Sequence, residues 1–133
     1  MRKHTTILLV EPENDVRLLM AVALRRLGYS VIEATTATDA CARFGDATWT
    51  VALLLSEAVL PDGTGTDLYR LLVGIDPRLR LLLISGQRES AGVIRKPFSL
   101  DALSEKVRDR LRGRVDIEPA PVRLRTMSGF SVR

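Results

Sequence analysis

The chain has 133 residues, of which 46% are hydrophobic and 27% are charged. This length fits one globular domain with a single core, and the composition excludes general disorder. One cysteine, Cys41, excludes an internal disulfide, and one histidine, His4, leaves no ligand set for a zinc site. No apolar run approaches the roughly 20 residues that span a bilayer, so we expect no signal peptide, no membrane anchor and a cytoplasmic location.

The net charge of +4 comes from the C-terminal end of the chain. Residues 108–133 contain seven Lys and Arg against three Asp and Glu, whereas the two signs balance in residues 1–107. A basic tail can bind nucleic acid or an acidic partner, and it can equally be a solvated end. We therefore expect a domain at residues 1–113 followed by a basic tail at residues 114–133.

Short apolar runs alternate along the chain with longer segments of helical period. This pattern is typical of parallel strands joined by helices. Strands are predicted at residues 5–10, 30–34, 51–56, 80–85 and 92–95. Helices are predicted at about 15–27, 37–44 and 66–75, and a last helix follows Ser99 and stops at Gly113. The order of these elements indicates an α/β fold.

Capping residues mark the ends of the first two predicted helices. We predict Asn14 as the N-cap of the first helix and Gly28 as its C-terminal stop. Thr36 is followed three residues later by Asp39, a variant of the capping box, which places the start of the second helix after Thr36.

Polar residues follow four of the predicted strands. Glu11 comes after the first strand, Glu57 after the third, Ser85 closes the fourth and Lys96 follows the fifth. In an open parallel sheet the carboxyl ends of the strands form the ligand-binding edge. The sequence therefore predicts a cluster of acids facing a lysine and a hydroxyl at this edge.

Four segments in this order carry a resemblance to a known family: LLVEPE, LLLSEAVLPDGTGTDL, LLISG and RKPFSLDAL. Over about residues 5–112, the chain resembles a response-regulator receiver domain of the chemotaxis-regulator type in two-component signalling. The resemblance implies a flavodoxin-like, doubly wound, five-stranded parallel sheet with strand order 2-1-3-4-5.

The resemblance also implies roles for individual residues. In the family, an acidic pair binds Mg²⁺, an aspartate accepts phosphate from a phosphohistidine, and a Thr or Ser and a Lys contact the phosphoryl group. By position, the matching residues are Glu11 (first acid), Glu57 (phospho-acceptor position), Val59 (backbone carbonyl as metal ligand), Ser85 (hydroxyl), Lys96 (lysine) and Pro97 (the proline after the lysine).

Two residues of this pocket depart from the family pattern. Pro12 replaces the second acid of the pair and offers no carboxylate, so we predict that Mg²⁺ binds weakly. Glu57 carries its carboxylate one methylene further than an aspartate, which displaces it toward Lys96. Both changes impair in-line phosphoryl transfer and favour an atypical, or pseudo-receiver, variant.

A third departure concerns the connection between the last two strands. Only residues 86–91 separate them, whereas a crossover with a helix takes at least about 10 to 12 residues. We therefore predict that the family's fourth helix is missing. Its loss would uncover apolar side chains at 81–84, and we predict that residues 115–132 pack against the sheet edge or against a second subunit.

Three hypotheses of function follow from the sequence. The preferred one is a receiver module of a phosphorelay that is not an enzyme and acts by protein–protein contacts with a sensor histidine kinase or another signalling protein. The alternative is a conventional receiver that accepts phosphate from a histidine kinase. The last is nucleic-acid binding through the basic tail, which no recognition helix or zinc finger supports.

Overall fold

Five parallel strands form the main sheet of the computed structural model, which describes residues 5–48, 50–85, 93–95 and 99–112. The strands are β1 (Thr6–Val10), β2 (Ser30–Ala34), β3 (Val51–Glu57), β6 (Arg80–Ser85) and β7 (Val93–Arg95). Their spatial order is β2-β1-β3-β6-β7, and every neighbouring pair is parallel. This arrangement confirms the predicted doubly wound sheet with strand order 2-1-3-4-5.

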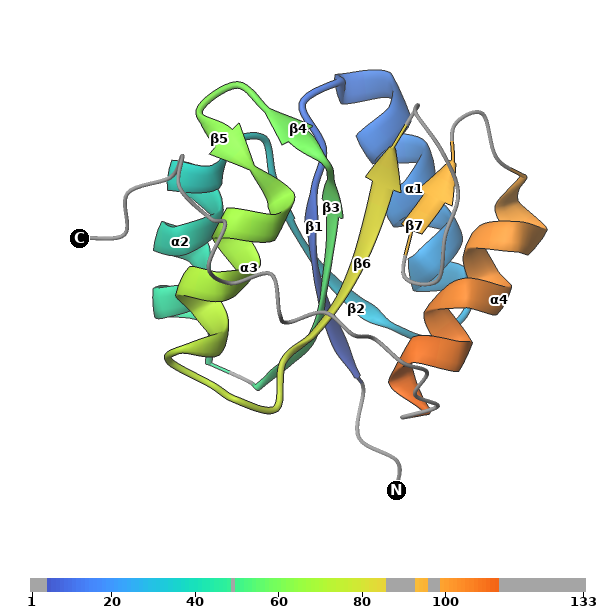
Figure 1. Ribbon diagram of the computed structural model, residues 1–133. Helices are drawn as coiled ribbons and strands as arrows, with labels where there is room; N and C mark the ends of the chain where they lie inside the picture. Colours follow the sequence, from blue (N-terminus) through green and yellow to red (C-terminus); the bar gives the residue numbers. More distant parts are fainter. Residues whose placement is uncertain (1–4, 49, 86–92, 96–98, 113–133) are drawn as a thin grey trace.

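Four helices cover the two faces of the sheet (Figure 1). Helices α1 (Asn14–Arg26) and α4 (Leu100–Leu111) pack on one face, and α2 (Ala37–Asp46) and α3 (Gly65–Val73) pack on the other. Each helix lies against strands that precede or follow it in the chain, as right-handed crossovers in a parallel sheet require. The result is a three-layer α/β fold.

The central strands are buried on both faces. In β1, Ile7 and Leu9 join the core cluster under α1 and α4, whereas Leu8 and Val10 join the cluster under α2 and α3. All four side chains have 0% exposure. This burial explains why the strands are continuous apolar runs rather than alternating ones.

Hydroxyl side chains cap three of the helices. Thr36 Oγ1 accepts a hydrogen bond from the Asp39 N–H, which confirms the predicted start of α2. Thr64 caps α3 and Ser99 caps α4 in the same way. Each bond satisfies one of the backbone donors that a helix leaves open at its N-terminus.

The predicted cap of α1 was wrong, although its predicted end was right. Asn14 is the first residue of the helix, Glu13 occupies the N-cap position, and no side chain makes a cap hydrogen bond there. The N–H of Glu13 instead donates to Glu11 Oε2 at 3.0 Å, so the turn begins one residue earlier than expected. At the other end, Gly28 has φ +102°, a conformation that favours glycine and terminates the helix.

Two arginines fasten the last helix to the sheet. Arg80, at the start of β6, donates through Nη1 to the carbonyl oxygens of Arg110 (2.8 Å) and Leu111 (3.0 Å) at the end of α4. In return, Arg110 Nε donates to the carbonyl of Leu81 at 3.0 Å. A cation at the C-terminus of a helix also complements the helix dipole.

Several predictions fall outside the described residues. They concern the missing fourth helix between β6 and β7, the positions of Lys96 and Pro97, the boundary at residue 113 and the packing of the basic tail. Of the fourth strand, Leu82 and Ile84 are fully buried and Leu81 and Leu83 are half-buried. Among the helices that can be described, none has the length and apolar character that a bilayer crossing requires.

Candidate functional site

The register of the sheet brings Glu11, Glu57 and Ser85 to its carboxyl edge, at the top of Figure 1. Val10 of β1 pairs with Ser56 of β3. Glu11 follows Val10 in the chain, and Glu57 follows Ser56. Glu57 pairs in turn with Ile84, which immediately precedes Ser85. These neighbours are the three described members of the predicted cluster.

The side chains of both glutamates lie on the side of the sheet that α1 and α4 cover. Leu9 and Leu55 belong to the core cluster of that face, and side chains two residues apart on a strand point to the same side. Glu11 follows Leu9 by two residues and Glu57 follows Leu55 by two. Two carboxylates therefore extend the same face at adjacent strand ends.

Three hydrogen bonds fix Glu11 in place. Its N–H donates to the Ala34 carbonyl at 3.1 Å, its carbonyl accepts from Arg17 Nη1 at 3.0 Å, and its Oε2 accepts from the Glu13 N–H at 3.0 Å. The residue is 1% exposed. Of these three bonds, the one from the Glu13 N–H reaches the carboxylate, and the other two hold the backbone of Glu11.

Glu57 ends β3 in a half-buried position with its Oε1 atom buried. The Ser56 hydroxyl donates to the Glu57 carbonyl at 2.8 Å, and the next N–H, of Ala58, donates to the Ile84 carbonyl at 2.7 Å. These contacts hold the backbone of the acceptor position on both sides.

Gly65 lets the first turn of α3 approach this backbone. A Cβ atom at Gly65 would lie 2.7 Å from the Glu57 carbonyl oxygen, 2.8 Å from Leu83 Cδ2 and 2.9 Å from Ser56 Oγ. No real side chain tolerates such distances, so this position needs glycine for close packing.

A short hairpin not expected from the sequence follows Glu57. It consists of β4 (Val59–Leu60) and β5 (Gly63–Thr64), which pair antiparallel around Pro61 and Asp62. The Val59 side chain is exposed, while its backbone pairs with Thr64. The hairpin therefore sets the position of the Val59 carbonyl, the candidate third metal ligand.

Asp62 joins this hairpin to the start of α2. Its carboxylate accepts from the Ala37 N–H (2.8 Å), the Thr38 N–H (2.9 Å) and the Thr38 hydroxyl (2.7 Å). Partial burial tends to raise the pKa of Asp62, but these hydrogen bonds outweigh it and lower the pKa below its usual 3.8. Burial, and secondarily the Asp62 charge, raises the pKa of the nearby Cys41 thiol.

The chain offers fewer oxygen ligands for Mg²⁺ than the resemblance to the family implies. Pro12 contributes no oxygen from its side chain, and Glu11 Oε2 already accepts from the Glu13 N–H. Among the described residues, no three His, Cys, Asp or Glu side chains form a group that could hold a metal ion. Glu11 and Glu57 thus fit only part of a site for this cation.

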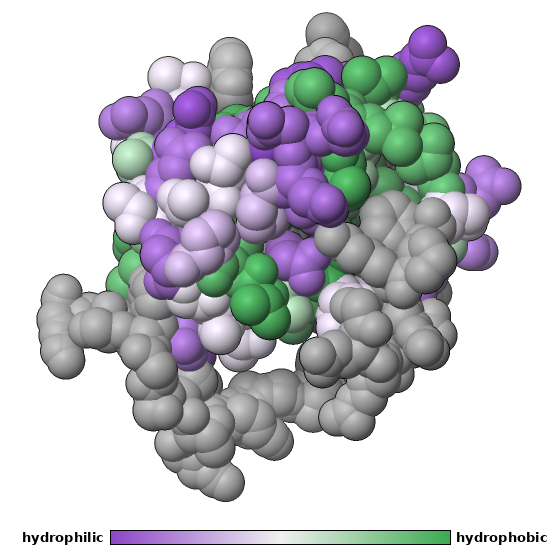
Figure 2. Space-filling model, turned by 90° about the horizontal axis from the view of Figure 1, so that it is seen from above, coloured by the Kyte–Doolittle hydropathy of each residue, from purple (hydrophilic) through white to green (hydrophobic). Residues whose placement is uncertain are grey.

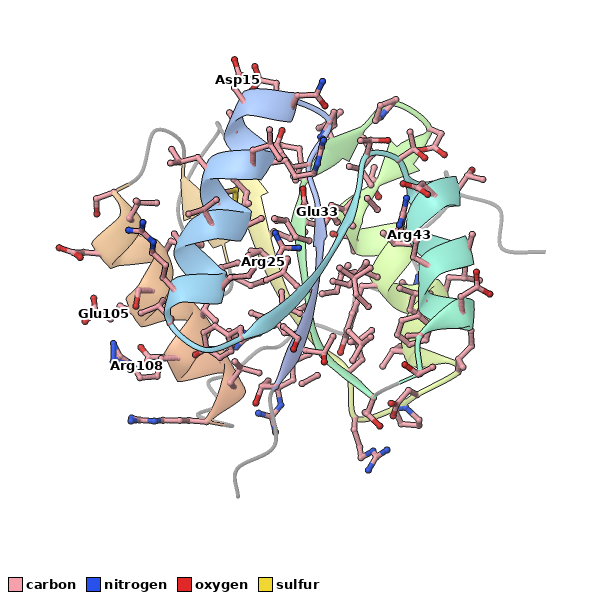
Figure 3. All side chains as sticks on the ribbon, turned by 180° about the vertical axis from the view of Figure 1, so that it is seen from behind. Asp15, Arg25, Glu33, Arg43, Glu105 and Arg108 are labelled. Atoms are coloured by element: carbon pink, nitrogen blue, oxygen red, sulfur yellow. The ribbon has the colours of Figure 1, made fainter. Side chains whose placement is uncertain are left out.

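Sequence reasoning missed Arg17, Glu33 and Asp62. Arg17 and Arg25 of α1 both pair with Glu33 of β2, at 3.2 and 3.1 Å, and Figure 3 shows Arg25 and Glu33 close together between these elements. All three missed residues act between segments distant in the sequence, so neither periodicity nor a local motif marks them. For Asp62 the only signal was the PDG turn itself.

Comparisons with known proteins agree with this geometry. No family model matches the chain. The chain is 31% identical over 116 residues to the response regulator receiver protein CpdR of Brucella abortus (strain 2308), covering 79% of this chain and 95% of that protein. It is 32% identical over 117 residues to the sensor kinase CckA of the same organism, covering 80% of this chain but only 12% of the kinase. The crystal structure of the receiver domain of the hybrid histidine kinase CckA matches with a TM-score of 0.73 and 31% identity, over 80% of this chain and 98% of that one.

We expect Gly65→Ala to destabilise the protein by about 1–3 kcal/mol, because the added methyl group overpacks the contact with the Glu57 backbone. The matched control is Gly45→Ala in α2, where a Cβ atom meets nothing within 4 Å. It should stabilise the helix by up to about 1 kcal/mol. Urea denaturation of both variants measures the difference, and equal stabilities would contradict the close approach at Gly65.

We expect Asp62→Asn to lower the free energy of unfolding by about 1 kcal/mol at pH 7, because α2 loses a charged N-terminal acceptor. Since the folded-state pKa of Asp62 is lowered, its stabilisation is full above pH 3.8 and is lost as the pH falls through that lowered pKa. The two proteins should converge in strong acid. Asp46→Asn, at the opposite end of α2, is the control and should show no such loss. A difference that persists unchanged into strong acid would refute the contribution of the charge.

Proposed function

Because this chain belongs to the response-regulator receiver family, we propose that it is a receiver module that signals through protein contacts and has lost ordinary phosphotransfer. The supporting observation is that Glu57 stands at the acceptor position while Pro12 replaces an acid of the pair. In this proposal Ser85 and Lys96 keep the family's hydroxyl and lysine positions, and Pro97 follows the lysine. The module turns over no substrate.

The length of Glu57 argues against efficient acceptance of phosphate. In-line transfer depends on positioning, and displacement of a reacting atom by about 1 Å can cost roughly 100-fold in rate. Moving the strand end to absorb the extra methylene would disturb close packing, because Gly65 at the start of α3 lies directly against the Glu57 carbonyl. The acceptor carboxylate is therefore displaced relative to that of an aspartate on the same backbone.

The cation side of the pocket is weakened as well. When bound, Mg²⁺ neutralises charge on the phosphoryl oxygens. The family pocket counts three acids and one lysine, whereas Glu11, Glu57 and Lys96 leave a net charge of only −1. A smaller negative charge and one missing carboxylate both lower cation affinity, so we propose weak Mg²⁺ binding.

Helix α1 offers a surface for a protein partner. Leu18, Leu19 and Val22 are 51%, 57% and 48% exposed on a helix that starts beside Glu11. Figure 2 shows apolar side chains gathered on part of the face seen from above, next to the hydrophilic residues of the carboxyl edge. Exposed apolar groups of this kind mark protein contacts. We assign this surface to a sensor histidine kinase, since relatives of this chain are a receiver protein and a sensor kinase.

The test of the function is phosphorylation of the full chain by acetyl phosphate with Mg²⁺, followed by intact mass. We expect no phosphoryl gain in the native protein and a gain in the Pro12→Asp/Glu57→Asp double variant, which restores both carboxylates. Pro12→Asp/Glu57→Gln is the control and should stay unlabelled. The two single variants show which departure dominates. Phosphoryl gain by the native chain would refute the proposal and establish the alternative, a conventional receiver.

The test of the α1 surface is binding to the purified cytoplasmic parts of sensor histidine kinases. For a kinase that binds the native chain, Leu19→Ser should raise the dissociation constant about tenfold, because the substitution removes an apolar contact. Ile75→Ser, which changes an even more exposed apolar residue after α3, should have no effect. Equal effects of the two variants, or kinase binding that ignores Leu19, would exclude α1 as the contact surface.

A further inference from the structure

Arg17 links the acidic edge to the neighbouring strand and helix. Its guanidinium donates through Nε to Glu33 Oε1 (3.2 Å), through Nη1 to the Glu11 carbonyl (3.0 Å) and through Nη2 to Asn14 Oδ1 (2.9 Å). The side chain is only 12% exposed. Three acceptors in different directions use the planar, forked geometry of arginine, which lysine lacks.

A second arginine shares one partner of Arg17 but none of its contacts with the site. Arg25 Nη1 pairs with Glu33 Oε2 at 3.1 Å, and its Nη2 donates to the Val31 carbonyl at 2.9 Å. Both arginines therefore tie α1 to β2 through Glu33, but of the two only Arg17 has a hydrogen bond to Glu11 among the described contacts. This difference supplies a matched pair for experiment.

The turn between β1 and α1 depends on these hydrogen bonds. Pro12 has no backbone N–H, so it cannot contribute a donor to the turn. The turn is held instead by the Glu13 N–H on the Glu11 carboxylate and by Arg17 on the Glu11 carbonyl. By holding the Glu11 carbonyl, Arg17 fixes the orientation of the backbone from which the Glu11 side chain projects.

We propose that Arg17 is a positioning residue for the Glu11 carboxylate, anchored by Glu33 on the edge strand. It deepens the proposed function, since Glu11 is an acid of the receiver pocket. Arg17 contacts Glu11 at its backbone carbonyl rather than at its carboxylate, so we assign it a geometric action on the site. Through it, the direction of the Glu11 side chain is coupled to the position of β2.

The first test is a ¹H–¹⁵N spectrum of the native chain and of three variants. In Arg17→Met the Glu13 amide signal shifts, because its hydrogen bond to Glu11 changes, whereas Arg25→Met leaves that signal in place. Arg17→Lys keeps the charge without the fork and behaves like Arg17→Met. A Glu13 signal that is unmoved in Arg17→Met, or moved equally by Arg25→Met, overturns the proposal, as does a native-like Arg17→Lys.

The second test titrates Mg²⁺ alone into the Pro12→Asp/Glu57→Asp protein. Adding Arg17→Met raises the Mg²⁺ dissociation constant about tenfold, the usual loss when a group that orients a ligand is removed. Adding Arg25→Met changes it less than twofold, and equal changes contradict the role of Arg17. Neither readout requires phosphorylation, so labelling of the native chain would refute the proposed function and leave the role of Arg17 standing.

Discussion

All five strands of the main sheet run in the same direction, and most of the architecture follows from that constraint. Parallel strands need crossovers that place helices on both faces, so the central strands must be apolar throughout. Polar side chains are then confined largely to the points where the strands end. Glu11, Glu57 and Ser85 come from segments distant in sequence and become neighbours only because their strands terminate at one edge.

The predictable parts of the fold were those that local sequence controls. Apolar runs of strand length and hydroxyl caps such as Thr36 identified the main strands and the start of α2, and both were confirmed. The Asn14 cap was wrong because the Glu11 carboxylate engages the Glu13 N–H and moves the turn. The contacts of Asp62 with α2 and the pairing of Arg17 with Glu33 escaped prediction, because each joins different elements that meet only in the folded chain.

The candidate site shows the same division. The presence of acids at the strand ends was predictable from the sequence, but their support was not. Gly65 presses α3 against the acceptor backbone, and the Asp62 hairpin sets the adjacent loop against α2. The backbone at Glu57 is therefore held between the start of α3 and the hairpin that follows β3.

The reciprocal contacts of Arg80 and Arg110 determine where the last helix ends relative to the acidic cluster. They fix the end of α4 at the start of β6, which is the amino edge of the sheet and the one opposite the acidic cluster (Figure 1). The described end of α4 therefore lies at the pole of the domain opposite Glu11 and Glu57. Strand β6 (Arg80–Ser85) thus spans the sheet from the anchored end of α4 to the acidic edge, where Ser85 closes it.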